Sequence, residues 1–299
     1  MKQAAELNRE FGIDDELGFA DIDGEPIAWI RNDACAATIA RKGAQVLSWY
    51  PHGHAEVFWL SSIRPESPDA PLRGGVPICW PWFGPHPDDP SKPKHGFVRT
   101  RRWEVLSSRS TAHSTELVLK TETAPADLAL WPHQAEVSLR IAAGATLRLE
   151  LTTRNTGPQA FELTEALHSY FYVSDIAHVA VCGLEDLDYL DKLDGYTRKK
   201  QTGPIVIDGA VDRIYIGHTG CAVIRDVGLG RGIVVTKSGS SSTVVWNPWA
   251  EHAQELGDMP EDGYRHMVCV ETANASDDIV RIEPGGEHTL AAEFQVATG

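Results

Sequence analysis

The chain has 299 residues, of which 42% are hydrophobic and 23% are charged, and its formal net charge is −15. This length suits two ordinary domains or one large β domain, since β sandwiches often run past about 200 residues as one unit. The negative charge disfavours nucleic acid and anionic membrane surfaces as partners, because both are themselves negatively charged.

No stretch of the sequence is long and apolar enough to span a bilayer. Residues 1–12 mix charged and apolar side chains and lack the apolar region of a signal peptide, so we expect a cytoplasmic protein. The five cysteines are far apart and form no CxxC pair, which indicates reduced thiols. We also expect the chain to be a monomer.

Residues 1–18 are predicted to form a short helical or irregular lead-in segment. After them the hydrophobic pattern repeats every two residues, as in a strand, and not with the period of a helix. The runs with this pattern are short, rich in β-branched residues and bounded by turn formers, and they cover residues 36–50, 115–123, 135–156, 161–173, 221–227, 232–239, 242–247, 266–273 and 288–296. Within 135–156, Gly144 is predicted to join two strands. The sequence therefore predicts an all-β protein, a single domain over residues 1–299 with large packed antiparallel sheets.

Two segments do not fit a strand pattern. Residues 61–96 carry nine prolines, which remove hydrogen-bond donors and restrict φ, so this segment is predicted as an ordered loop. Residues 247–264 are predicted as a second long loop with room for a helical turn. Long loops on a rigid β scaffold often carry binding and catalytic residues.

Positive charge is concentrated in one part of this acidic chain. Five cations and His95, but no acid, lie between Lys92 and Arg102. Arg73 precedes two glycines, which would let the backbone approach a ligand closely. Because a guanidinium matches the geometry of phosphate oxygens, these residues indicate an anion pocket for a phosphorylated small molecule. A solvated basic turn paired with surface acids explains the same charges equally well.

Two titratable residues are candidates for acid–base chemistry. The alternation of apolar residues places His168 and Tyr170 on one strand face, and Leu167 and Phe171 on the other. Glu271 ends an apolar run, where burial would raise the pKa of its carboxyl and suit it to general-base work. Taken singly, a strand histidine is more often structural than catalytic, and an ion-paired glutamate at a strand end is as good an explanation.

No metal or nucleotide site is indicated. His52 and His54 would share a strand face but have no third ligand, and the chain has no HExxH, P-loop or GxGxxG motif in context. We therefore expect no metal and no cofactor. The nine tryptophans include potential platforms for sugar rings, although most are expected to fill the core.

The sequence contains, in this order, the segments LRGGVPICWPWFGPH, KHGFVRTRRWEV, EALHSYFYV, VDRIY, VVWNPW and CVETAN. Together they resemble the aldose 1-epimerase (galactose mutarotase-like) superfamily, and within it the glucose-6-phosphate 1-epimerase, or hexose-6-phosphate mutarotase, branch. The resemblance extends over about residues 36–296 and implies a β-supersandwich with the sugar in a groove on its concave side. It also implies His168 and Glu271 as the catalytic pair.

The same resemblance implies contacts to the substrate from Arg73, His95, Arg99 and Asp212. The two arginines would hold the 6-phosphate, and Asp212 would contact the sugar. Trp82 stands where some relatives carry glutamine, so it either stacks on the sugar or simply packs.

The expected activity is the interconversion of α and β anomers of hexose 6-phosphates, chiefly glucose 6-phosphate. Glu271 would take the O1 proton while His168 protonates the ring oxygen, and the ring would open and reclose without a cofactor. Three alternatives stay open: an epimerase for unphosphorylated aldoses, a non-catalytic sugar-binding sandwich, and a glycosidase or lyase. The last would need a second carboxylate, for which Asp212 is the candidate.

Overall fold

The computed structural model describes residues 2–65, 67 and 70–298. Residue 1 of the predicted lead-in, residues 66, 68 and 69 of the predicted loop, and residue 299 lie outside the described residues. The lead-in forms α1 (Ala4–Phe11), which buries Leu7 in the core. Among the described helices, none is long and apolar enough to cross a membrane.

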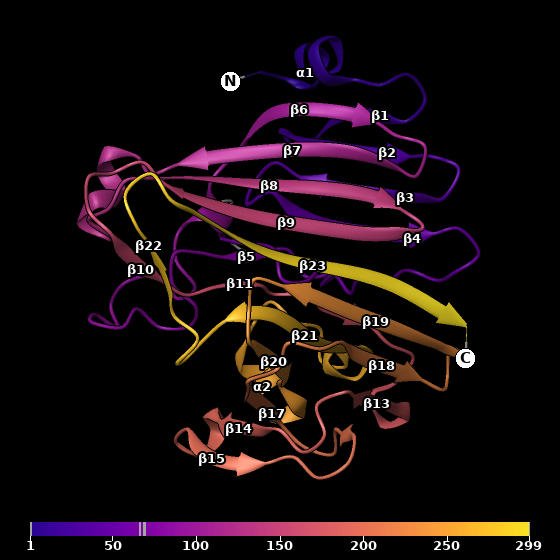
Figure 1. Cartoon of the computed structure of the whole chain (residues 1–299). Coiled ribbons are helices and arrows are strands. Elements are labelled where there is room, and N and C mark those ends of the chain that lie inside the picture. The colour runs from indigo at the N-terminus through magenta and orange to yellow at the C-terminus, as the bar shows by residue number, and fades with distance from the viewer. Residues whose placement is uncertain (1, 66, 68–69, 299) are drawn as a thin grey trace.

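One layer of the molecule is a nine-stranded antiparallel sheet (Figure 1). Its strands, in spatial order, are β16 (Ile205–Val206), β13 (Val179–Cys182), β18 (Ala222–Asp226), β19 (Arg231–Ser238), β23 (Glu287–Thr298), β9 (Thr146–Asn155), β8 (Ala135–Gly144), β7 (Ser114–Glu122) and β6 (Glu104–Ser110). The predicted turn at Gly144 is confirmed, because β8 ends there and β9 begins two residues later.

The opposite layer consists of an eight-stranded and a four-stranded sheet, with a small two-stranded sheet beside them. The eight strands are β15 (Thr197–Lys200), β14 (Asp188–Asp191), β17 (Val211–Ile216), β20 (Ser242–Asn247), β21 (Met267–Asn274), β11 (Glu165–Leu167), β5 (Ile78–Cys79) and β12 (Tyr170–Tyr172). The four are β1 (Leu17–Ile22), β2 (Glu25–Arg31), β3 (Cys35–Ala40) and β4 (Gln45–Pro51), and the pair is β10 (Phe161–Leu163) and β22 (Val280–Ile282). The predicted all-β sandwich is thus confirmed.

Helical segments after α1 are short. They are α2 (Trp249–Glu255) and five 3₁₀ turns: η1 (Val98–Thr100), η2 (Pro125–Ala129), η3 (Ile176–His178), η4 (Lys192–Asp194) and η5 (Gly263–His266). The predicted second loop therefore does contain a helical turn, α2. The predicted loop 61–96 is irregular apart from the two residues of β5.

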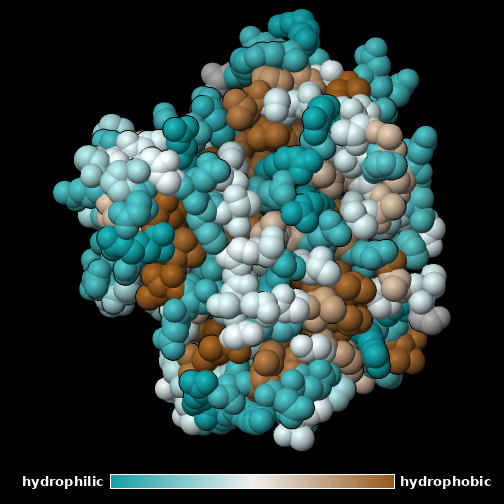
Figure 2. Space-filling model, viewed as in Figure 1, coloured by the Kyte–Doolittle hydropathy of each residue, from teal (hydrophilic) through white to brown (hydrophobic). Residues whose placement is uncertain are grey.

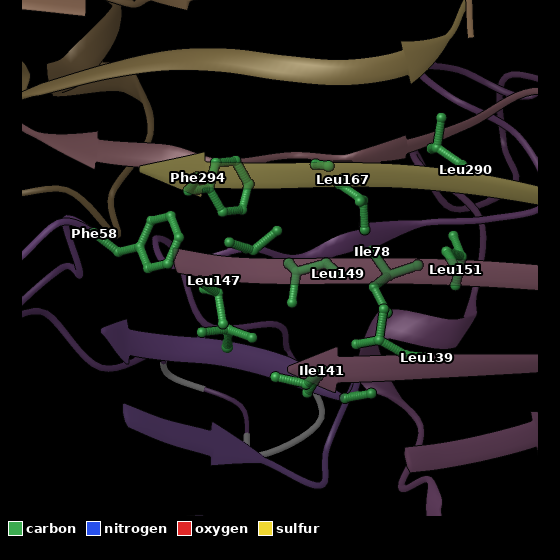
Figure 3. Close-up of a cluster of buried hydrophobic side chains, with 14 of the residues drawn as sticks. Phe58, Ile78, Leu139, Ile141, Leu147, Leu149, Leu151, Leu167, Leu290 and Phe294 are labelled. Atoms are coloured by element: carbon green, nitrogen blue, oxygen red, sulfur yellow. The ribbon is translucent and has the colours of Figure 1, made fainter. Parts of the chain in front are cut away.

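The main core lies between the two layers. Leu147, Leu149 and Leu151 alternate along β9 and pack in one layer with Phe294 of β23, and Leu167 of β11 meets them from the other sheet (Figure 3). All five side chains are fully buried. In the view of Figure 2, hydrophobic residues appear on the surface as separate patches among hydrophilic ones. The apolar side chains are therefore concentrated between the sheets, where alternation along each strand directs them.

The second face of the eight-stranded sheet points away from this core. Val268 and Val270 of β21 belong to the main core, whereas Met267 and Cys269 belong to a separate cluster that includes Ala253 of α2. The residues after β20, which contain α2, thus cover part of this second face. The face carries the candidate site.

The predicted strand 161–173 is broken into β10, β11 and β12, so the expectation of one continuous strand was wrong. The cause is the irregular loop beside it: the N–H of His168 donates to the carbonyl oxygen of Pro77 at 3.0 Å, and the N–H of Tyr170 donates to that of Gly75 at 2.9 Å. The predicted alternation is nevertheless confirmed, because Leu167 lies in the main core and Tyr170 on the opposite face.

Candidate active site

The candidate site residues lie on the second face of the eight-stranded sheet. The strand register pairs Tyr170 with Cys269, Cys269 with Trp246, and Trp246 with Asp212. These four side chains therefore form one row across β12, β21, β20 and β17. Glu271, two residues after Cys269, lies in the next row on the same face because strand side chains alternate.

His168 and Glu271 form a titratable pair on this surface. Nε2 of His168 lies 3.4 Å from Oε1 of Glu271. Glu271 lies inside β21 rather than at a strand end and is 1% exposed, whereas the side chain of His168 is 12% exposed. The imidazole is thus the member of the pair that a ligand reaches from solvent.

Aromatic rings hold the imidazole of His168 in place. The ring of Tyr170 stacks on it with a centroid distance of 4.9 Å and an interplanar angle of 12°. The rings of His95, Trp246 and Phe83 follow at 5.6, 6.3 and 6.5 Å. Because rings pack against it on several sides, the imidazole has little freedom to turn.

The protonation of the pair follows from its burial. Burial, followed by the electrostatic interactions with His95 and Arg99, lowers the pKa of His168 well below its ordinary value. Burial also raises the pKa of Glu271 well above its ordinary value, and the ammonium of Lys192 opposes this shift. Both shifts favour the uncharged forms, a neutral imidazole on His168 and a protonated carboxyl on Glu271. Within the part of the chain that the structure describes, Nδ1 of His168 and Oε2 of Glu271 are buried and have no hydrogen-bond partner.

His95 is a neutral imidazole with a defined tautomer. The N–H of Gly84 donates to Nδ1 of His95 at 3.2 Å, so the proton of the neutral ring is on Nε2. Burial, followed by the charge of Arg99, lowers the pKa of His95 to about 3. His95 can therefore donate one hydrogen bond from Nε2 to a ligand oxygen at any pH near neutrality.

Lys192 lies beside the pair, although no sequence pattern singled it out. Its Nζ lies 2.7 Å from Oδ2 of Asp212 and 5.6 Å from the centre of the Phe83 ring. Lys192 belongs to η4, between β14 and β15, so only the folded sheet brings it next to β17. Burial raises the pKa of Asp212 and Lys192 opposes this shift, while Oδ1 of Asp212 lacks a hydrogen-bond partner among the described residues.

The guanidinium of Arg73 is held by two side chains. Its Nε donates to Oδ1 of Asp258 at 2.5 Å, and its Nη1 donates to the hydroxyl oxygen of Tyr170 at 3.2 Å. Arg73 is thus connected through Tyr170 to the stacked ring of His168. Asp258 was not predicted, because a single acid in a loop carries no recognisable pattern.

The two glycines after Arg73 permit a close approach to neighbouring backbone, while their role toward a ligand stays a prediction. A Cβ at Gly74 would lie 2.4 Å from the carbonyl oxygen of Trp59, and one at Gly75 would lie 2.1 Å from that of Val46. Both glycines therefore let the loop pack directly on the backbone of neighbouring segments.

The cations between Lys92 and Arg102 do not all face the site. The last two arginines pair with acids elsewhere: Arg101 with Asp127 and Arg102 with Glu25. Arg99 differs, because its Nη2 donates to the carbonyl oxygen of Lys94 at 2.8 Å and its charge lowers the pKa of His168. Arg99 is thus the arginine of this cluster whose charge acts on His168.

Trp82 is part of the main core. It is 4% exposed, its Nε1 donates to the carbonyl oxygen of Pro93 at 2.9 Å, and its ring lies edge-on against His86 and Phe97. With its polar atom satisfied by the backbone, Trp82 packs and has no face left for a sugar.

A cation is a poor fit to this site, although three potential ligands converge. One donor atom each of His168, Cys269 and Glu271 lie within 4.8 Å of one another. Burial raises the pKa of the Cys269 thiol well above its ordinary value, and the nearby guanidinium of Arg73 adds positive charge. A metal ion would have to displace protons from two acids against this field.

Comparison with known proteins identifies the family. A sequence profile described as Aldose 1-epimerase matches residues 27–295. The chain belongs to the aldose 1-epimerase family.

Relatives within the family are similar over most of their length. A protein of Escherichia coli (strain K12) named "Putative glucose-6-phosphate 1-epimerase" is 38% identical over 242 residues, which is 81% of this chain and 80% of that protein. A protein of the same name from Cenchrus ciliaris is 38% identical over 85% of this chain and 79% of its own.

Solved structures show the same fold. A crystal structure of a "putative mutarotase" from Salmonella typhimurium superposes with a TM-score of 0.87 at 34% identity, covering 95% of this chain and 94% of that one. A galactose mutarotase-like protein from Clostridium acetobutylicum gives 0.74 at 12% identity, covering 95% and 98% of the two chains. This second likeness concerns the fold alone.

The predicted family and fold are thereby confirmed for this aldose 1-epimerase family member. The structure also brings together most of the residues that the resemblance implied: His168, Glu271, Arg73, His95, Arg99 and Asp212. Their chemical roles stay predictions. Trp82 is the implied residue that does not reach the group.

Proposed function

We propose that this chain interconverts the α and β anomers of hexose 6-phosphates, chiefly glucose 6-phosphate, by acid–base opening and reclosure of the sugar ring. The observation that carries the proposal is the pair of His168 Nε2 and Glu271 Oε1, 3.4 Å apart on the second face of the eight-stranded sheet. Two groups this close can act on the two oxygens bonded to one anomeric carbon. Arg73 and Arg99, both near His168, supply the positive charge for a phosphate.

The reaction needs one proton in the pair and no net proton transfer. In the reactive state Glu271 is a carboxylate and His168 an imidazolium. Glu271 accepts the proton of O1, the C1–O5 bond breaks, and His168 gives its proton to O5, so that C1 becomes an aldehyde. After rotation about C1–C2, O5 attacks C1 and the C1–O5 bond forms again, while His168 removes the proton from O5 and Glu271 returns a proton to O1. The open-chain stage leaves Glu271 protonated and His168 neutral, which is the form favoured by burial in the free site.

A phosphate on the substrate would help His168 to act as the acid, in addition to strengthening substrate binding. The positive charges of Arg99 and Arg73 are among the causes that lower the pKa of His168. A bound phosphate dianion offsets these charges, so it favours the imidazolium that protonates O5. The phosphate is therefore expected to raise kcat in addition to lowering KM.

Replacement of either member of the pair tests the proposal. His168→Ala and Glu271→Gln should each lower kcat for anomer exchange of glucose 6-phosphate by at least about 10²-fold, the usual size of one acid–base contribution. Exchange is measured by NMR above the spontaneous rate. His178→Ala, at an exposed histidine of η3, is the control and should keep wild-type kcat. Near-normal exchange by either pair variant would contradict the proposed mechanism.

The substrate preference is tested separately. The wild-type protein should have a higher kcat/KM for glucose 6-phosphate than for glucose or galactose. An equal or higher value for the unphosphorylated sugars would identify an ordinary aldose epimerase. Sugar binding without any exchange would identify a binding protein.

A further inference from the structure

Among the described residues, a carboxylate and a hydroxyl accept hydrogen bonds from the Arg73 guanidinium. Oδ1 of Asp258 accepts a hydrogen bond from Nε at 2.5 Å, and the Tyr170 hydroxyl accepts one from Nη1 at 3.2 Å. These contacts leave one N–H on Nη1 and both on Nη2, so the end of the guanidinium, between Nη1 and Nη2, keeps donors for a ligand. This end can bind two oxygens of one phosphate at once. Asp258 therefore does not compete with a phosphate for the same donors.

Asp258 itself has a rigid support. The hydroxyl of Ser61 donates to the backbone oxygen of Asp258 at 2.7 Å. The next residue, Met259, is buried in a cluster with Trp59. The carboxylate is thus presented by a packed segment and not by a mobile loop tip, so it can define where the arginine lies.

The contacts continue from Asp258 to the catalytic pair. Arg73 joins Asp258 to Tyr170, and the ring of Tyr170 stacks on His168 with centroids 4.9 Å apart. An arginine held in this way keeps a fixed position relative to the imidazole. A sugar phosphate bound to it would therefore present its anomeric carbon at a defined distance from His168 and Glu271.

We propose that Asp258 is a positioning residue that orients Arg73 for bidentate binding of the substrate phosphate and so determines the preference for phosphorylated sugars. This inference rests on the proposed function. An unrestrained arginine side chain must lose its rotational freedom on binding, and the contact with Asp258 removes that cost in advance. Asp258 acts through Arg73 and does not itself touch the substrate.

Substitution at Asp258 separates this role from a purely structural one. Asp258→Ala should raise KM for glucose 6-phosphate about 10-fold, with kcat changed by less than about 3-fold. Asp258→Asn should restore most of the loss, because its amide oxygen can still accept from Nε. The slow exchange of unphosphorylated glucose should not change in either variant. Glu261→Ala removes one negative charge from an exposed position of the same loop and should behave as wild type.

Binding of inorganic phosphate gives a readout independent of catalysis. Isothermal titration calorimetry should show about 10-fold weaker phosphate binding for Asp258→Ala and near wild-type binding for Asp258→Asn and Glu261→Ala. Unchanged KM and unchanged phosphate affinity in Asp258→Ala, with only a lower Tm, would overturn the inference. An equal loss for glucose and glucose 6-phosphate would also overturn it. If the wild-type protein exchanges neither sugar, the proposed function fails, whereas the phosphate titration still tests Asp258.

Discussion

Lys192 influences both members of the proposed catalytic pair, His168 and Glu271, from one position. Its ammonium is among the charges that lower the pKa of His168, and it opposes the rise in the pKa of Glu271. It also pairs with the buried carboxylate of Asp212 at 2.7 Å. A single side chain of a turn thus adjusts three titratable groups.

Lys192→Ala should therefore move the pH–rate profile to higher pH by about 1 unit, because the pKa values of both Glu271 and His168 rise when the cation is lost. It should also lower kcat/KM about 10-fold, since Asp212 is left buried without its partner. The profile is measured by NMR exchange from pH 5 to 9. Lys200→Ala, at an exposed lysine of β15, should leave the profile in place. An unshifted pH–rate profile in Lys192→Ala would show that Lys192 does not adjust the pKa values of His168 and Glu271.

Glu165 is a buried carboxyl outside the catalytic pair. Burial raises its pKa to about 8, and a hydrogen bond from Thr153 opposes the shift only in part. An unfolded glutamate titrates near 4.5, so between about pH 4.5 and 8 the folded protein holds a proton that the unfolded chain has lost. The contribution of this group to stability is therefore full below about pH 4.5 and falls as the pH rises to about 8.

Glu165→Gln should remove that pH dependence, because the amide does not titrate. The free energy of unfolding of the wild type, relative to the variant, should fall by up to about 1.4 kcal/mol per pH unit across this interval. Urea titrations at pH 5 and pH 8.5 measure the difference. Glu162→Gln, at an exposed glutamate of β10, is the control. A wild-type-minus-variant difference that does not change with pH would contradict the assignment.

At the scale of elements, the loop 61–96 is held by direct backbone contact with its neighbours. Gly75 has φ +61° and would place a Cβ 2.1 Å from the carbonyl oxygen of Val46. Its own carbonyl oxygen accepts the N–H of Tyr170 at 2.9 Å. The loop thus joins β4 to the start of β12, and it brings Arg73 to the site.

Gly75→Ala should destabilise the protein by about 2 to 4 kcal/mol and raise KM, because the loop must move away from β4. Gly24→Ala is the matched control, since Gly24 has φ +80° but no atom within 4 Å of its Cβ position. It should cost only about 1 kcal/mol, the price of the backbone conformation alone. Thermal unfolding measures both. Equal losses of stability in the two variants would show that the close contact between Gly75 and Val46 does not contribute to stability.

At the scale of the whole molecule, the core and the site lie on opposite faces of one sheet. Leu149 is fully buried between the two layers, whereas the proposed catalytic pair lies on the second face of the eight-stranded sheet. Leu149→Ala should lower the free energy of unfolding by about 3 kcal/mol through loss of packing. Well below the Tm, kcat/KM should stay within about 2-fold of wild type. Leu106→Ala, at a half-exposed leucine of β6, should change neither the free energy of unfolding nor kcat/KM appreciably.

Sequence alone determined the fold class, the family and the two faces of the strands near the site. Period-2 alternation depends on neighbours in the chain, so the opposite placement of Leu167 and Tyr170 could be predicted without knowing which strands pair. The ordered motifs likewise located His168 and Glu271. The strands β14 and β15 were missed, because polar residues occupy much of them and weaken the alternation.

Only the tertiary structure decided how charges are paired. Lys192 reaches Asp212, and Asp258 reaches Arg73, from positions 20 and 185 residues away in the chain. Charge pairing depends on distance in space, and a strand order in which β17 lies between β14 and β20 cannot be derived from local patterns. For the same reason local charge patterns could not divide the basic cluster. The family resemblance singled out Arg99, and the structure shows that Arg101 and Arg102 pair with acids elsewhere.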